Sequence, residues 1–276
     1  MGLYIETQVR ADLETLWEHT QEPARHQRWD LRFTEIAYLP RAEGEPQHFR
    51  YATRVLPFLV VAGTGVSAGE RHRAGGDRVS ALRFSSPHPL SLLAEGSGYW
   101  RYIPTPDGVR FLTGYDYRPR WGRLGRLADR LAFRPLMGWA TAWSFDRLRL
   151  WCERGVTPER ALAHWLLELA ARVLLVAAPL TVASLPLGLL SLGAVPLTVL
   201  GLALAVLVPP SPRTPAARRC LRTPPARTRE PRLLATLEPT REPAPKPAPE
   251  PSPEPAPKPA PALFPKPAPE PALEQS

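Results

Sequence analysis

The sequence predicts an α+β domain followed by two membrane-spanning helices and a proline-rich tail. Strand-like alternation and short helical stripes fill the first 160 residues. From Val173 to Val208 there are 36 consecutive residues without a charge, and 22 of the 36 prolines lie after residue 208. These shifts in composition divide the chain into a domain over residues 1–156, a transmembrane helical hairpin over residues 157–208, and a disordered tail over residues 209–276 that is basic first and proline-rich later.

The N-terminal region alternates strand and helix signals. Leu3–Val9 has the alternation of a strand. Pro135 should kink or restart the long helix that we expect from Leu124 to Glu153. Between the first strand and this helix we expect two short helices, over Asp12–Glu18 and Pro23–Trp29. Six strands should follow, over Phe33–Leu39, His48–Leu56, Phe58–Ser67, Arg78–Phe84, Ser91–Ile103 and Val109–Tyr117. A curved antiparallel sheet around one long C-terminal helix buries the apolar faces of both.

Three short stretches within this order are informative: Tyr4-Ile5-Glu6-Thr7 before Leu16-Trp17, Pro23 to Trp29-Asp30, and Gly96-Ser97-Gly98-Tyr99-Trp100. Together with the last strand running into the long helix, they resemble the helix-grip fold of the START-like, polyketide-cyclase and lipid-transport (SRPBCC) superfamily over about residues 1–155. The resemblance implies a hydrophobic ligand held between the sheet and the long helix. Members of that superfamily include cyclases, dehydratases and lipid carriers, so the fold alone does not assign an activity.

Aromatic and apolar side chains of the last strands and the long helix are the candidates for the wall of such a pocket, because ligand pockets are mostly apolar. Trp139 and Trp143 lie four residues apart and share one helix face. Filling of the core is the alternative role of each ring. The pocket candidates are Trp100, Tyr102, Phe111, Tyr115, Tyr117, Leu131, Leu136, Trp139 and Trp143.

Four arginines, Arg123, Arg126, Arg130 and Arg134, fall on one face of the same helical segment. A solvated charged face is the simpler interpretation, and contact with anionic lipid headgroups is the functional one. The net charge of +9 also suits nucleic acid, but no nucleic-acid-binding motif accompanies it. We therefore expect a membrane and not a nucleic acid as the partner.

No catalytic motif is evident in the sequence. The six histidines lack metal-ligand spacing, and Cys152 and Cys220 lack metal or redox spacing. Asp30, Glu95 and Asp116 are the acids that a buried site would use, although solvated or ion-paired roles are simpler. We expect no metal, no cofactor and no catalytic residue, which favours a binding protein over an enzyme.

Two spans are predicted, near residues 165–184 and 189–208, after a helix start at Thr157-Pro158-Glu159 and with a turn at Leu185-Pro186-Leu187-Gly188. Trp165 suits the membrane interface. A hairpin buried in a globular core is the alternative, but the rest of the chain is too small to surround it. Arginines flank both ends of the hairpin and are missing from its turn, so both termini should be cytoplasmic.

The tail has proline at every second position from Pro243 to Pro261, which predicts an extended polyproline II segment. A spacer is the simpler interpretation, and a docking strip for a protein that reads proline-rich motifs is the functional one. Arginine greatly outnumbers lysine, as in many high-GC bacteria.

The sequence thus predicts an integral protein of the cell membrane whose cytoplasmic domain binds or carries a lipid-, quinone- or polyketide-like molecule. Two alternatives stay open: a cyclase or dehydratase that acts on a substrate from the membrane, and a scaffold that recruits partners through its tail. A buried acid or histidine facing an open cavity would favour the enzyme, whereas an open apolar cavity would favour the binding protein.

Overall fold

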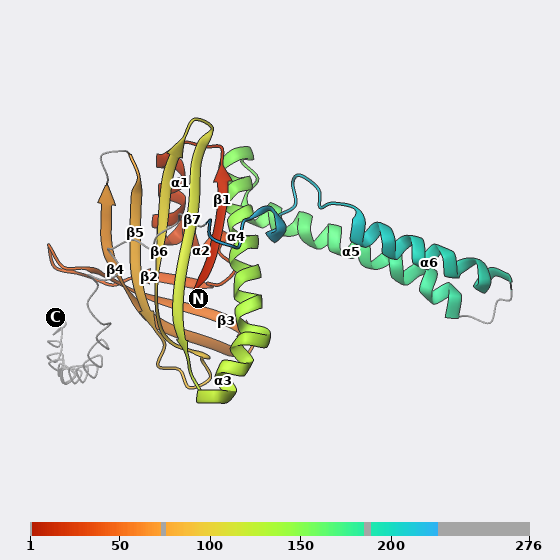
Figure 1. Cartoon of the computed structure of the whole chain (residues 1–276), viewed down its shortest axis with the longest axis horizontal. Helices are drawn as coiled ribbons and strands as arrows, with labels where there is room; N and C mark the ends of the chain where they lie inside the picture. The colour runs from red at the N-terminus through yellow and green to blue at the C-terminus, as the bar shows by residue number, and fades with distance from the viewer. Residues whose placement is uncertain (1, 73–75, 185–188, 226–276) are drawn as a thin grey trace, which may run out of the picture. The chain divides into compact units, whose positions relative to one another are not determined.

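In the part of the chain that the structure describes, the strands form one antiparallel sheet in the order β1-β7-β6-β5-β4-β3-β2 (Figure 1). The computed structural model describes residues 2–72, 76–184 and 189–225. The strands are β1 (Leu3–Val9), β2 (Glu35–Tyr38), β3 (Gln47–Leu56), β4 (Leu59–His72), β5 (Arg78–Ser85), β6 (Leu93–Thr105) and β7 (Gly108–Pro119). Each predicted strand is present, with ends shifted by a few residues.

The alternation along β7 gives the sheet two buried faces. Phe111 and Leu112 are both fully buried, although neighbours on a strand point to opposite faces. Phe111 belongs to the main core, whereas Leu112 packs with Tyr4 and Tyr99 in a smaller cluster. The main core lies on the face that the helices cover.

Local sequence signals account for the two short helices, α1 (Leu13–Gln21) and α2 (Pro23–Trp29). Asp12 caps α1, and its carboxylate accepts a hydrogen bond from the backbone N–H of Thr15 at 2.7 Å. Pro23 occupies the first turn of α2, where a missing N–H costs nothing. The two helices bring Leu16 and Trp29, both fully buried, onto the sheet.

The long helical segment is divided as the proline predicts. It consists of α3 (Gly122–Ala128), a π-helical turn η1 (Asp129–Phe133) and α4 (Arg134–Arg154). Pro135 lies in the first turn of α4, and because proline has no N–H it cannot continue the hydrogen-bond ladder of the preceding turn. The π-helical turn absorbs this interruption.

Helix α4 is fixed on the sheet by ring contacts. The rings of Phe111 and Phe145 stack with centroids 4.5 Å apart, and Trp29 meets Phe145 at 6.1 Å. Residues of α4, β1 and β7 share one buried cluster. The strand order and the helix packed on the sheet fit the helix-grip α+β fold that the sequence predicts.

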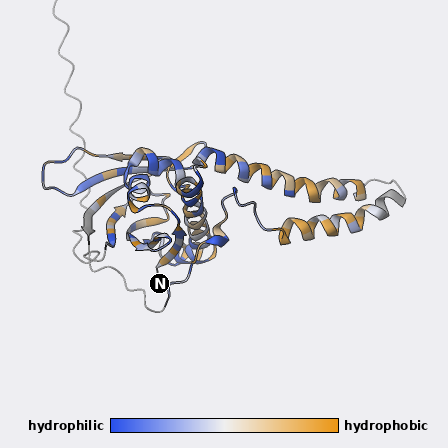
Figure 2. Cartoon of the chain, turned by 90° about the horizontal axis from the view of Figure 1, so that it is seen from above, coloured by the Kyte–Doolittle hydropathy of each residue, from blue (hydrophilic) through white to orange (hydrophobic). Residues whose placement is uncertain are grey.

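Two apolar helices follow, α5 (Pro158–Ser184) and α6 (Leu189–Leu207) (Figure 2). The two helices approach closely at Gly201, where an added Cβ would collide with the carbonyl oxygen of Leu175. Among the described residues α5 is the helix that is long and apolar enough to cross a membrane, while α6 carries a shorter apolar stretch, Gly193–Leu207. A helical hairpin is therefore present, and its two-span insertion stays a prediction. The predicted turn at 185–188 lies outside the described residues.

The start of the tail differs from the prediction of disorder from residue 209. Residues 209–222, here called the post-hairpin segment, return to the domain and include a short 3-10 helix, η2 (Ala217–Arg219). Ala217 and Cys220 are buried in the main core, and Leu221 forms an antiparallel bridge with Glu6 on the edge strand β1. Small apolar side chains and a free strand edge explain this packing. The proline-rich part of the tail lies outside the described residues.

Candidate functional site

A cavity of about 640 Å³ lies between α4, residues 165–172 of α5, the end of α6 and the post-hairpin segment. Three tryptophans, Trp139, Trp143 and Trp165, form one wall; the ring centroid of Trp165 lies 6.4 Å from that of Trp139 and 5.7 Å from that of Trp143. Leu169 and Val206 add apolar surface from the two apolar helices. We call this site the tryptophan cavity, and its volume is in the range of small-molecule sites.

The N-terminal half of α5 contributes an ion pair to the cavity wall. The guanidinium of Arg172 donates to the carboxylate of Glu168 at 2.6 Å and to the carbonyl oxygen of Val208 at 2.9 Å, and it also bonds the carbonyl of Ala205. Glu168 additionally accepts from the backbone N–H of Ser211 at 3.1 Å. Arg172 therefore satisfies carbonyls at the C-terminal end of α6, where a cation is favoured.

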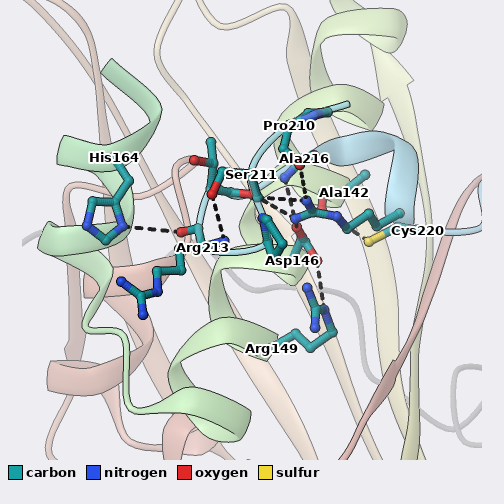
Figure 3. Close-up of polar contacts among 12 residues, drawn as sticks. Ala142, Asp146, Arg149, His164, Pro210, Ser211, Arg213, Ala216 and Cys220 are labelled. Carbon is teal, nitrogen blue, oxygen red and sulfur yellow. Dashed lines mark hydrogen bonds and ion pairs between the residues drawn. The ribbon is translucent and has the colours of Figure 1, made fainter. Parts of the chain in front are cut away.

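The post-hairpin segment is held by a buried carboxylate (Figure 3). Asp146 of α4 has a fully buried side chain and accepts from Nε of Arg149 at 2.7 Å, from a guanidinium N–H of Arg219 at 2.8 Å, and from the backbone N–H of Ala216 at 2.8 Å. A buried carboxylate is stable only with such partners. The thiol of Cys220 donates to the carbonyl of Ala142 at 3.2 Å nearby.

Arg219 does more than neutralise Asp146. Its second guanidinium nitrogen donates to the carbonyl oxygens of Pro210 at 3.0 Å and Ser211 at 2.9 Å, and its first also reaches that of Thr214 at 2.7 Å. One side chain thus orders the backbone that forms a wall of the tryptophan cavity. Neither Asp146 nor Arg219 was among the predicted site residues, because their pairing spans 73 positions; only the Asp146–Arg149 spacing was a local signal.

The sheet aromatics among the pocket candidates pack in the core and do not line the tryptophan cavity. Trp100, Tyr102 and Phe111 are buried, and the rings of Trp100 and Tyr102 each contact that of Phe111. The hydroxyl of Tyr102 is paired with Thr20 at 2.7 Å, and that of Tyr115 with Thr141 at 3.1 Å.

Of the remaining pocket candidates, four lie on the long helical segment and Tyr117 lies on β7. Trp139 and Trp143 line the tryptophan cavity, whereas Leu131 and Leu136 are exposed at 70% and 59%. Tyr117 is buried and donates to Asp129 at 2.5 Å. The structure therefore brings only two of the nine candidates to this cavity.

The arginine candidates also separate. Arg134 lies 3.3 Å from the carboxylate of Asp129 and 5.5 Å from the ring centre of Tyr117. Burial raises the pKa of Tyr117, and its bond to Asp129 adds to the shift. The other three, Arg123, Arg126 and Arg130, are exposed and form no ion pair with any described residue, and exposed leucines lie between them.

Of the three acids considered, Asp30 is buried and Glu95 and Asp116 are exposed. Asp30 accepts from Arg32 at 2.6 Å and 2.9 Å and pairs with His26 at 3.1 Å. Burial alone would raise the pKa of Asp30, but the charge and hydrogen bonds of Arg32 outweigh it and hold that pKa well below its usual range. Burial lowers the pKa of His26 despite the opposing effect of Asp30. The buried carboxylate of Asp30 therefore has its charge and hydrogen bonds satisfied by Arg32 and His26.

Neither cysteine forms a disulfide, and burial raises the pKa of each thiol to about 12. Among the described residues no three histidine, cysteine or acidic side chains lie close enough to hold a metal ion. These thiols are therefore protonated at neutral pH and act as apolar packing groups.

No family model matches the chain. The uncharacterized membrane protein YndG of Bacillus subtilis (strain 168) is 52% identical over 159 residues, which make up 57% of this chain and 59% of that protein. The chain thus spans less than two thirds of the length of this curated relative.

Several solved structures are similar at low identity. The di-domain aromatase/cyclase StfQ of the steffimycin pathway shares 14% identity over 56% of this chain and 50% of its own, with a TM-score of 0.43. Human StAR-related lipid transfer protein 5 shares 15% over 55% and 76%, with a TM-score of 0.42, and TTHA0849 of Thermus thermophilus shares 16% over 59% and 98%, with 0.41. At these scores the fold assignment rests on this chain's own strand order and helix packing.

Proposed function

We propose that this chain is a membrane-tethered binding protein for a hydrophobic molecule, and that the tryptophan cavity is its binding site. The observation that carries the proposal is the position of the cavity: its walls include α4 of the domain and residues 165–172 of the apolar helix α5. A wall of three indole rings beside apolar helices suits a ligand that comes from a bilayer.

The tether is the α5–α6 hairpin. The uncharged stretch begins directly after Arg172, and the side chains of the apolar window of α5 are not buried in the domain. With the hairpin in a membrane, both termini lie in the cytoplasm, and the cavity lies where the hairpin enters the bilayer. The relative YndG is described as a membrane protein, which supports the tether but says nothing of its orientation.

A second membrane contact is part of the proposal. Arg123, Arg126 and Arg130 are exposed beside Leu124 and Leu127, which are exposed at 78% and 55%. Basic and apolar side chains side by side on a surface suit the headgroup region of an anionic bilayer. This surface supports the cytoplasmic, membrane-facing position of the domain.

Binding is favoured over a cyclase or dehydratase activity by one observation. The buried acid Asp30 is paired with both Arg32 and His26, and none of the three lines the tryptophan cavity. A catalytic acid needs contact with its substrate. We assign this group to stabilisation of the α2–β2 connection.

The test is retention of a fluorescent apolar probe, such as a pyrene-labelled acyl chain, by the full chain in detergent. Trp139→Ala should weaken retention at least tenfold, because it removes one of the three indole rings that form the apolar wall. Trp151→Ala is the matched control, since Trp151 is also a partly buried tryptophan of α4 but packs on His19. Equal retention by the wild type and Trp139→Ala, at equal folded fraction, would contradict the proposed site.

A further inference from the structure

We infer that the tryptophan cavity takes an anionic amphiphile, whose acidic head lies at Arg218 and Arg222 and whose apolar part lies against Trp139 and Trp165. This inference rests on the proposed binding function and adds the charge and class of the ligand. Arg218 and Arg222 both belong to the post-hairpin segment and both line the cavity.

The three arginines of this part of the segment have different surroundings. Arg219 is committed to Asp146 and to three backbone carbonyl oxygens. Arg218 and Arg222 are exposed at the cavity, and neither has an acidic partner within the described residues. Arg219 thus stabilises the cavity wall, while Arg218 and Arg222 present positive charge to a bound ligand. Guanidinium groups bind carboxylate and phosphate through two parallel hydrogen bonds.

The acidic side chain that lines the cavity does not oppose an anion. Glu168 is bound by Arg172 at 2.6 Å and by the N–H of Ser211 at 3.1 Å. Its charge is balanced within the wall, so the excess charge of the cavity comes from Arg218 and Arg222. Charge complementarity therefore selects a negatively charged ligand.

The ligand class is therefore an acyl chain that carries a carboxylate or phosphate head. Two sources share this chemistry, a free fatty acid and an acidic phospholipid of the bilayer. The apolar wall that Leu169 and Val206 contribute continues into the α5–α6 hairpin, so a chain can lie along the same helices that lie in the membrane. No covalent step is involved.

The experiment uses the full chain in dodecyl maltoside and three probes: dodecanoic acid, dioctanoyl phosphatidylglycerol and dioctanoyl phosphatidylcholine. Each probe is titrated below its critical micelle concentration while tryptophan fluorescence is recorded. The test variant combines Arg218→Gln with Arg222→Gln. Arg213→Gln is the matched control, an exposed arginine of the same segment outside the cavity.

We expect at least one anionic probe to bind about tenfold more tightly than the zwitterionic one, because a hydrogen bond between charged groups contributes about that factor. The double variant should abolish this preference, and Arg213→Gln should leave affinity unchanged. Tighter binding of dodecanoic acid points to a free fatty acid, and tighter binding of phosphatidylglycerol points to a bilayer lipid.

Equal binding of all three probes, or an unchanged preference in the double variant, would overturn the inference and leave the proposed hydrophobic site intact. Binding of none of the probes would overturn both. Thermal unfolding of each variant by circular dichroism identifies a loss of binding that comes from misfolding.

Discussion

Two regions that pack against α4 are rich in aromatic side chains: the ring cluster of Trp29, Phe111 and Phe145, and the tryptophan cavity. The first is closed, whereas the second contains open volume. In the ring cluster, Phe111 and Phe145 stack at 4.5 Å and are closed in by Trp29. In the cavity, Trp139 and Trp165 have rings 6.4 Å apart beside about 640 Å³ of open volume. Aromatic content therefore does not define a pocket; the elements that close around the rings do.

The largest expected effect lies in the ring cluster. Phe111→Ala should lower the free energy of unfolding by about 4 kcal/mol, because it opens a cavity among fully buried rings. Trp139→Ala should cost clearly less, since Trp139 is only partly buried and already lines open volume. Thermal unfolding of both variants, followed by near-ultraviolet circular dichroism, compares them. Equal losses would mean that the two regions pack alike.

The next effect concerns the wall of the cavity. Asp146→Ala should destabilise the protein by about 3 kcal/mol, because it leaves Arg149 and Arg219 without their buried partner. It should also speed tryptic cleavage at Arg218 and Arg222 as the post-hairpin segment detaches. Limited proteolysis with mass spectrometry measures both sites. Asp107→Ala, a change in the turn between β6 and β7, is the control and should leave the cleavage rate unchanged.

A smaller effect should follow pH, through the buried polar group near the ring cluster. The pKa of His26 is lowered in the folded state, so unfolding takes up a proton below about pH 6.5, the usual histidine value. The contribution of His26 to the free energy of unfolding should therefore be fully present above about pH 6.5 and should be lost as the pH drops towards about 5. The pKa of Asp30 is also lowered, so a further loss should begin below about pH 4.

His26→Gln isolates the first step of this pH dependence. The variant should be less stable at about pH 7.5, because stacking on Trp29 and the bond to Asp30 are lost, but its melting temperature should change less between about pH 7.5 and about pH 5. The melting temperature of the full chain is measured across this range. A wild-type protein that gains stability on acidification would contradict the assigned direction.

The smallest effect should come from the exposed arginines of α3 and η1, which belong to neither ring region. Replacing Arg123, Arg126 and Arg130 with Gln should leave the melting temperature within about 1 °C, since exposed changes are nearly neutral. It should reduce protection of α3 from hydrogen exchange in nanodiscs that contain phosphatidylglycerol, while nanodiscs of phosphatidylcholine should show no difference. The same protection in both lipids would exclude this membrane contact.

Local pattern explains why most of the fold could be predicted. The alternation of β1 and β7, the proline at the start of α2 and the interruption at Pro135 are each set by neighbours in sequence. The apolar character of α5 and α6 is equally local. The return of Cys220 to the core was missed, because the arginines around it are typical of a solvated segment.

What the sequence by itself determined is the set of elements, their apolar faces and the division between a domain and an apolar hairpin. Only the tertiary structure decided that Trp139 lines a cavity while Phe145, six residues along α4, closes the core, and that Asp146 meets Arg219. The physical reason is distance along the chain. Helical and strand periodicity act over a few residues, whereas a cavity wall and a buried ion pair depend on which remote segments pack together once the chain has closed.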